Sequence, residues 1–142
     1  MTQSHEKNIK WLLLQATIPV KQTLHKLAEK HGLTTMQLWT MNLLHSHDEI
    51  PMNSISQRLG CDASNVTGIA DRLLDMGLID RHEYSQDRRI KMIRLSKKGV
   101  KLRMKLLKEL DESSIDSLER LNKEEQVILE KLLLKANQSE AD

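Results

Sequence analysis

The sequence CDASNVTGIADRLLDMG, residues 61–77, is the most informative stretch of this chain. Its apolar residues recur at steps of three and four, the spacing of one apolar helix face, at Val66, Ile69, Ala70, Leu73 and Leu74. Asp62 is placed to cap the start of this helix, and Gly77 is placed to end it. The outward positions carry short hydrogen-bonding side chains, then an acid and a guanidinium: Ser64, Asn65, Thr67, Gly68, Asp71 and Arg72. A helix that contacts base edges in a major groove needs such a first turn, but an ordinary surface helix has the same pattern, so its neighbours must discriminate.

The segments on either side favour DNA binding. A short helix is expected over 53–59, and the turn Gly60-Cys61-Asp62 joins it to the helix above. This order predicts a helix-turn-helix. Two short strands are expected next, at 78–83 and 90–95, joined by the polar tip YSQDRR at 84–89. A hairpin with two adjacent arginines at its tip suits the minor groove, so the sequence predicts a winged helix-turn-helix.

Long amphipathic helices are expected outside this region. The first spans about 6–30, and Pro19 within it predicts a kink or a break near 17–19. A capping box of Thr34 and Gln37 opens a helix to about residue 46, and 50–51 is expected to be an extended link. Ser96 is expected to cap a helix that continues to about residue 121, and Asn122 begins the last helix. Their apolar stripes have no partner within a small winged domain, which indicates a homodimer.

Charge is segregated along the chain. The 142 residues have a formal net charge of +2, but residues 72–105 hold eleven lysines and arginines against four acids, a net of +7. Such a basic segment indicates a polyanionic partner, although a solvated helix face is the simpler alternative. Cys61 is the only cysteine, which fits a reducing compartment, and we find neither a signal peptide nor the ~20 apolar residues of a membrane span. We therefore expect a cytoplasmic protein that does not contact membranes.

At this point the sequence resembles the MarR family of winged helix-turn-helix transcription regulators. The resemblance rests on six motifs in order: LTxxQ at 33–37, ISxxLG at 55–60, SxVTxxxDRLxxxGLIxR at 64–81, DRR at 87–89, LSxxG at 95–99 and LxxEE at 121–125. It implies an obligate dimer that binds a palindromic operator in double-stranded DNA. It also implies that Asp87 braces the wing, that Arg89 enters the minor groove, and that Ser64, Thr67 and Arg72 belong to the recognition helix. Many members have Arg or Lys where this chain has Gly68, so base recognition is expected to differ.

The expected fold is mainly α with a small β-wing. We expect an N-terminal dimerisation helix in 1–32, a winged helix-turn-helix in 33–96, and a long helix with a C-terminal helix in 97–142 that complete the dimerisation region. The predicted DNA-binding residues on the recognition helix are Ser64, Asn65, Thr67, Gly68 and Arg72. Those on the wing are Asp87, Arg88, Arg89 and Lys91.

Several single residues allow a second interpretation. His45 and His47 could bind a metal, but residues 96–142 supply no His or Cys to complete a site, so no metal is expected. Cys61 could be a redox switch, and a small apolar residue in the turn is the favoured alternative. Trp11 and Trp39 could line an effector pocket, although a core position is favoured for both.

The predicted function is a dimeric, sequence-specific DNA-binding transcription regulator. We expect a repressor that a small phenolic or antibiotic-like ligand relieves. The alternatives are a winged-helix protein-interaction adaptor without an effector and a metal- or thiol-responsive regulator. No phosphate-binding loop, catalytic triad or paired-carboxylate motif is present in the sequence, so we expect neither enzymatic activity nor a cofactor.

Overall fold

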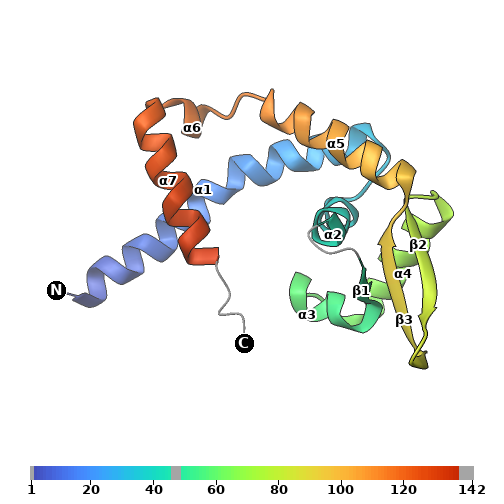
Figure 1. The fold of residues 1–142 in the computed structure, drawn as a ribbon. Coiled ribbons are helices and arrows are strands. Elements are labelled where there is room, and N and C mark those ends of the chain that lie inside the picture. Colours follow the sequence, from blue (N-terminus) through green and yellow to red (C-terminus); the bar gives the residue numbers. More distant parts are fainter. Residues whose placement is uncertain (1, 46–48, 138–142) are drawn as a thin grey trace. The chain divides into compact units, whose positions relative to one another are not determined.

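Helices make up most of the chain (Figure 1). The computed structural model describes residues 2–45 and 49–137, and it describes side chains from residue 8 onward except that of His45. In chain order the elements are α1 (Thr2–Lys30), α2 (Thr35–His45), β1 (Ile50–Pro51), η1 (Met52–Ser54), α3 (Ile55–Leu59), α4 (Ala63–Asp75), β2 (Ile79–Tyr84), β3 (Asp87–Leu95), α5 (Lys97–Asp111), α6 (Asp116–Glu119) and α7 (Lys123–Asn137). The expected fold class is confirmed: the chain is mainly helical and carries one small antiparallel sheet.

The chain divides into two compact units, which we describe separately. The first, here called the winged unit, is Leu24–Glu112. The second, here called the terminal unit, combines the chain up to Thr23 with the chain from Ser113 onward. The three-part division expected from the sequence stays a prediction, because it concerns dimerisation rather than compactness.

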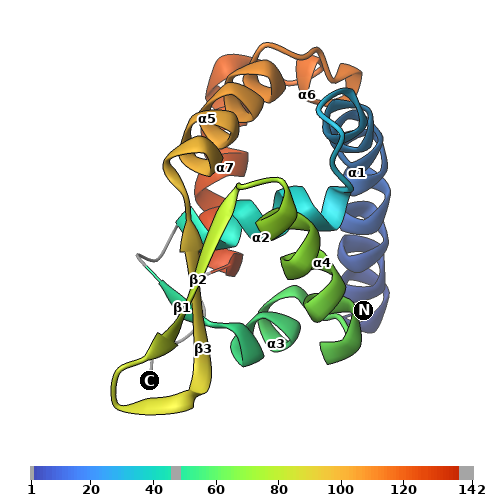
Figure 2. The same cartoon turned by 90° about the vertical axis from the view of Figure 1, so that its right-hand side faces the viewer.

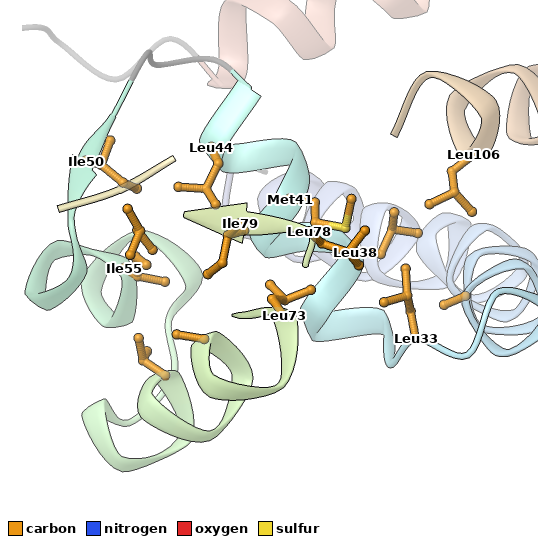
Figure 3. Close-up of a cluster of buried hydrophobic side chains, with 14 residues drawn as sticks. Leu33, Leu38, Met41, Leu44, Ile50, Ile55, Leu73, Leu78, Ile79 and Leu106 are labelled. Carbon is orange, nitrogen blue, oxygen red and sulfur yellow. The ribbon is translucent and has the colours of Figure 1, made fainter. Parts of the chain in front are cut away.

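The winged unit has a hydrophobic core that connects α2, α3, α4, the sheet and α5 (Figure 3). Met41, Leu44, Ile55, Leu73 and Ile93 are all within 1% of complete burial. The apolar stripe of α4 points into this core, since Val66, Ala70 and Leu73 are buried. Each large side chain contributes roughly 1.5–3 kcal/mol when it is fully buried, so this cluster accounts for much of the stability of the unit.

The sheet has the strand order β1-β3-β2, and both pairs are antiparallel. Ile93 of β3 lies opposite Ile50 on one side and opposite Arg81 on the other. The two strands of the wing were predicted, with bounds that differ by one to three residues from those observed. The extended link at 50–51 proves to be a third strand, because residues remote in the sequence pair with it.

Local sequence signals set most of the helix ends. Two capping boxes are observed. At the start of α2, the amide of Gln37 donates to Thr34 Oγ1, and the amide of Thr34 donates to Gln37 Oε1. At the start of α7, the amide of Glu125 donates to Asn122 Oδ1, and the amide of Asn122 donates to Glu125 Oε2. Ser96 caps α5 by accepting a bond from the amide of Gly99. Asp62 occupies the N-cap position of α4 in an extended conformation, but its side chain makes no capping bond. Gly77, with φ 68°, follows the end of α4 as predicted.

Two helix predictions need comment. The helix α1 runs without a break from Thr2 to Lys30, so the alternative of a break near 17–19 is wrong, and the alternative of a kink at Pro19 stays a prediction. The fifth helix was expected to reach residue 121, yet α5 ends at Asp111. Two serines follow its end, and Ile115 is extended (φ −127°, ψ 102°), so a new short helix, α6, begins after it. Serine side chains compete for backbone hydrogen bonds, which explains the early end.

The terminal unit leaves large apolar side chains exposed. On α1 these are Ile9, Trp11, Leu12, Leu13, Leu14 and Ile18. On α6 and α7 they are Leu118, Val127, Ile128, Leu132, Leu133 and Leu134. So many exposed large apolar side chains are unusual on a monomer and indicate a surface that another molecule covers. Among the described residues, no helix has the length and apolarity needed to cross a membrane.

Candidate nucleic-acid interface

A set of hydrogen bonds fixes the recognition helix α4 to the wing and to α5. The Ser96 hydroxyl donates to the carbonyl of Gly77 at 2.7 Å, and the Ser96 amide donates to Leu78 O at 3.0 Å. Lys98 Nζ donates to Met76 O at 2.7 Å, which satisfies a carbonyl at the C-terminal end of α4. The end of α4, the first residues of β2 and the start of α5 therefore form one rigid junction.

All five recognition-helix residues predicted from the sequence lie on the exposed side of α4. They are Ser64, Asn65, Thr67, Gly68 and Arg72. Figure 2 shows α3 and α4 in the winged unit with the hairpin of β2 and β3. Because the opposite side of α4 is buried in the core, the unit presents its polar side to solvent in a fixed orientation.

Two hollows flank this exposed side of α4. One, of about 280 Å³, lies between α4 and the wing, and its lining includes Thr67, Arg89 and Lys91. The other, of about 620 Å³, lies between α4 and the start of α2, and its lining includes Thr34, Ser64 and Gly68. The helix therefore stands out as a ridge between two depressions, a shape suited to insertion into a groove.

The wing holds one arginine through the aspartate two residues before it. Asp87 Oδ1 accepts bonds from the backbone amide of Arg89 at 3.0 Å and from Arg89 Nε at 3.1 Å, and Oδ2 accepts from Nη2 at 3.2 Å. These hydrogen bonds lower the pKa of Asp87 below its ordinary value, so the carboxylate stays charged. The Arg89 side chain is nevertheless 91% exposed, so its guanidinium is oriented without being covered.

Residues 33–91 match the MarR family model. This part of the chain belongs to the MarR family. It is 35% identical over 71 residues to the HTH-type transcriptional repressor MdtR of Bacillus subtilis (strain 168), a match that covers 50% of this chain and 46% of MdtR. It is 26% identical over 132 residues to the HTH-type transcriptional regulator FarR of Neisseria gonorrhoeae, over 93% of this chain and 90% of FarR. The chain spans about half the length of MdtR, and also of the uncharacterized HTH-type regulator YfiV (46%).

Solved structures of MarR-family proteins share the fold. A mutant of MepR from S. aureus superposes with a TM-score of 0.71 at 26% identity, covering 89% of this chain and 94% of that one. A mutant of MarR from E. coli complexed with operator DNA has a TM-score of 0.71 at 19% identity, covering 92% and 94%. The winged helix architecture is therefore that of MarR-family proteins.

Ion pairs engage four of the eleven cations of the basic segment, including Arg89, which Asp87 holds. Lys91, predicted as a DNA-binding residue, donates to Glu83 at 2.7 Å across the hairpin. Arg94 lies 3.7 Å from Asp80, its partner in the strand register. The Arg81 guanidinium lies 3.5 Å from Asp71 and so connects β2 to α4. By contrast, Arg72 and Arg88 are exposed, and no such pair is observed for them among the described residues. None of these pairs was predicted from the sequence, because the pairs within the hairpin depend on the strand register and the Arg81–Asp71 pair depends on how β2 packs beside α4.

The two tryptophans are exposed, so the core position favoured for them is wrong within a single chain. Trp11 is 59% exposed in the terminal unit, and Trp39 is 42% exposed on α2 in the winged unit. One helical turn after Trp39, Asn42 accepts two bonds from the Arg103 guanidinium, at 2.8 and 3.2 Å. Partial burial lowers the pKa of Arg103 below its ordinary value, and its observed partner is a neutral amide.

The residues with alternative sensing roles are placed as follows. Cys61 is partly buried and packs against the core, as expected for a small apolar residue in the turn. The side chain of His45 and the whole of His47 lie outside the described residues. Among the described residues, no group of three or more His, Cys, Asp or Glu side chains could hold a metal ion.

Proposed function

We propose that this MarR-family protein is a sequence-specific regulator that binds double-stranded DNA as a homodimer. The observation that carries the proposal is the joint exposure of the polar side of α4 and of the Asp87-oriented Arg89, on either side of one hollow. In this proposal α4 enters a major groove, and the wing places Arg89 in the adjacent minor groove. Two solved structures support the proposal, since a MarR mutant was solved with operator DNA and a MepR mutant with an oligodeoxyribonucleotide.

Base contacts in this proposal come from the first two turns of α4. Ser64, Asn65 and Thr67 present hydroxyl and amide groups that can exchange hydrogen bonds with base edges. Arg72 lies just over one turn beyond Gly68 and, with Arg88 on the wing, supplies charge for phosphates. Lys91 contributes less charge than its identity suggests, because Glu83 already accepts its ammonium.

Dimerisation follows from the exposed apolar side chains of the terminal unit. A second copy of the chain carries the same exposed apolar side chains. In a two-fold symmetric dimer the same surface of each chain forms the interface, so each copy would cover the apolar side chains of the other. The dimer would present two winged units to a palindromic operator with half-sites about 34–36 Å apart. Each large apolar side chain fully buried in that interface would stabilise it by roughly 1.5–3 kcal/mol.

Repression and its relief by a ligand are the finer parts of the proposal. MdtR is described as a repressor, which supports the same role here. Arg103 binds Asn42, which lies three residues after Trp39 on α2, so we expect the two side chains to share one side of this helix. Together they suit an aromatic anion, with the indole stacking on its ring and the guanidinium binding its carboxylate or phenolate. Trp11 remains a predicted effector residue of the terminal unit. A ligand would relieve repression by favouring a spacing of the two α4 helices that does not fit DNA.

The experiment is selection of duplexes from a random library, followed by measurement of affinity against salt concentration. A regulator that uses arginines and lysines from two subunits loses affinity steeply with salt, with a log–log slope of about −0.9 for each phosphate neutralised. The enriched sequence should be a palindrome. Failure to enrich any sequence, together with salt-independent binding, would contradict the proposal and favour a protein-interaction adaptor.

A further inference from the structure

Gly68 lies in the middle of α4, on its exposed side, and the fold does not require a glycine there. Its φ is not in the left-handed region, and a Cβ added to it would meet no atom within 4 Å. Glycine is the least favourable helix-interior residue apart from proline. An alanine at this position would therefore fit the structure and stabilise the helix.

The other four glycines of the chain each have a structural reason to be glycine. Gly32, Gly60 and Gly77 have φ between 64° and 70°, which side chains disfavour. At Gly99 an added Cβ would lie 2.0 Å from the carbonyl oxygen of Leu78. Gly68 differs from all four: it destabilises α4 relative to alanine, and no feature of the folded chain requires a glycine at this position.

The residues around Gly68 indicate why a glycine stands at this position. Ser64 and Asn65, four and three residues earlier on α4, line the same 620 Å³ hollow as Gly68. All three side chains are short or absent, so little side-chain bulk stands between the backbone of α4 and a molecule that approaches it here. Glycine is used where a backbone must approach a ligand closely.

We propose that Gly68 determines the DNA specificity of this protein by allowing the backbone of α4 to approach the base edges. This inference rests on the proposed DNA-binding function and adds which base is recognised. At that short distance the Asn65 amide reaches an adenine, where it accepts from N6 and donates to N7. A side chain at residue 68 holds the helix away from the groove floor and breaks this pair of bonds.

The test uses Gly68→Ala in the full-length chain and the duplex that the unmodified chain selects from a random library. The melting temperature rises by about 2–5 °C, because alanine favours the helix. Affinity for the selected duplex falls about tenfold, because the contact of Asn65 with its adenine is lost and the loss of one base contact typically has an effect of this size. Affinity for a scrambled duplex of the same length changes less than twofold, because phosphate contacts remain. Gln22→Ala, an exposed neutral substitution on α1, serves as the control and changes neither affinity.

A second arm tests the adenine directly. Replacing single adenines of the selected site by 7-deazaadenine removes the N7 acceptor without changing base pairing. The unmodified chain loses about tenfold in affinity at one such position, and Asn65→Ala makes that position indifferent. Wild-type affinity in Gly68→Ala, a lowered melting temperature in Gly68→Ala, or equal sensitivity of Asn65→Ala to 7-deazaadenine would overturn the inference. If the unmodified chain selects no duplex at all, the proposed function itself fails, which is a different result.

Discussion

The winged unit and the terminal unit differ in where their large apolar side chains lie. In the winged unit, most large apolar side chains are buried, and Met41, Leu44 and Leu73 are essentially inaccessible; the exposed ones are few, namely Trp39, Met104 and Leu107. In the terminal unit, α7 has no buried residue in the single chain, and its apolar side chains such as Ile128 are exposed. Both units are built from similar amphipathic helices, so the difference shows that the winged unit is complete in one chain and the terminal unit is not.

This contrast assigns different work to the two units. The complete unit holds α4 and the wing in a fixed geometry, as recognition of DNA requires. In the proposed dimer, the terminal unit supplies the surface that joins the two chains. Substitutions in the two units should therefore have separable effects, on folding and DNA contact in one and on association in the other.

The largest expected effect comes from Gly99→Ala in the winged unit. The added methyl group would lie 2.0 Å from the Leu78 carbonyl oxygen, at the junction of α4, β2 and α5. We expect the free energy of unfolding to fall by roughly 3 kcal/mol or more, as overpacking against backbone requires the backbone to move. Urea unfolding followed by circular dichroism measures this.

Gly68→Ala is the matched control for that substitution. It adds the same methyl group where nothing lies within 4 Å, so it should stabilise the chain by up to about 1 kcal/mol. Equal stability of the two alanine variants would show that the junction yields easily and that the winged unit is less rigid than described.

The second prediction concerns the terminal unit and uses the double substitution Ile128→Glu with Leu132→Glu. These residues are four apart on α7, so they share one face, and both are more than half exposed in the single chain. Charges there should weaken the dimer by roughly 100-fold or more, since two apolar contacts of about 1.5–3 kcal/mol each are lost. Sedimentation equilibrium measures the dissociation constant.

Glu124→Gln in the first turn of α7 changes charge without touching the apolar face, and it should leave the dimer intact. An unmodified chain that sediments as a monomer at micromolar concentration would refute the assignment of the terminal unit to dimerisation.

The third prediction separates two cations of the wing. Arg89→Ala should weaken operator binding by about tenfold, or 1–3 kcal/mol, with little change in melting temperature, because its side chain is exposed. Lys91→Ala should have a smaller effect, because its ammonium is already paired with Glu83. Fluorescence anisotropy with the selected duplex compares them, and an Arg89→Ala variant of wild-type affinity would exclude the wing assignment.

The smallest expected effect is a pH dependence at Glu109 in the winged unit. Hydrogen bonds from Lys30 at 2.9 Å and from His31 at 3.1 Å lower the pKa of Glu109 below its ordinary value of 4.5. A carboxyl whose pKa is lowered on folding stabilises the fold above its unfolded pKa, and this contribution disappears as the pH falls through the lowered value. Thermal melts from pH 6 to pH 3 should therefore decline less steeply in Glu109→Gln.

Glu112→Gln is the control for Glu109, because its partner Lys108 is 3.7 Å away and both side chains are mostly exposed. A decline as steep in Glu109→Gln as in the unmodified chain would show that this carboxylate contributes nothing to the acid sensitivity.

The sequence predicted those features that depend on residues close together in the chain. Capping by Thr34, Ser96 and Asn122 was predicted correctly, because each bond joins residues three apart. The exposed side of α4 was predicted from its apolar period. Once the apolar side of α4 is assigned to the core, its polar side chains must face solvent, so the exposure of the candidate DNA-binding residues could be predicted from the sequence.

The remaining features depend on partners far away in the sequence. The strand at 50–51 exists because Ile50 pairs with Ile93, and no local pattern indicates that pair. The pairing of Lys91 with Glu83 depends on the hairpin register, which shifts between Glu83 and Tyr84. The early end of α5 was missed because apolar residues such as Ile115 and Leu118 continue the helical spacing beyond it. This spacing predicted a longer helix in spite of Ser113 and Ser114, which favour a helix end.

The central claim is that two winged units bind one duplex together because their terminal units form a dimer. Hydroxyl-radical footprinting of the selected duplex, with the number of bound chains per duplex measured in parallel, tests it most directly. The account predicts two chains per duplex and two protected segments whose centres are one helical turn apart, about 34–36 Å. One chain per duplex with a single protected segment would contradict it.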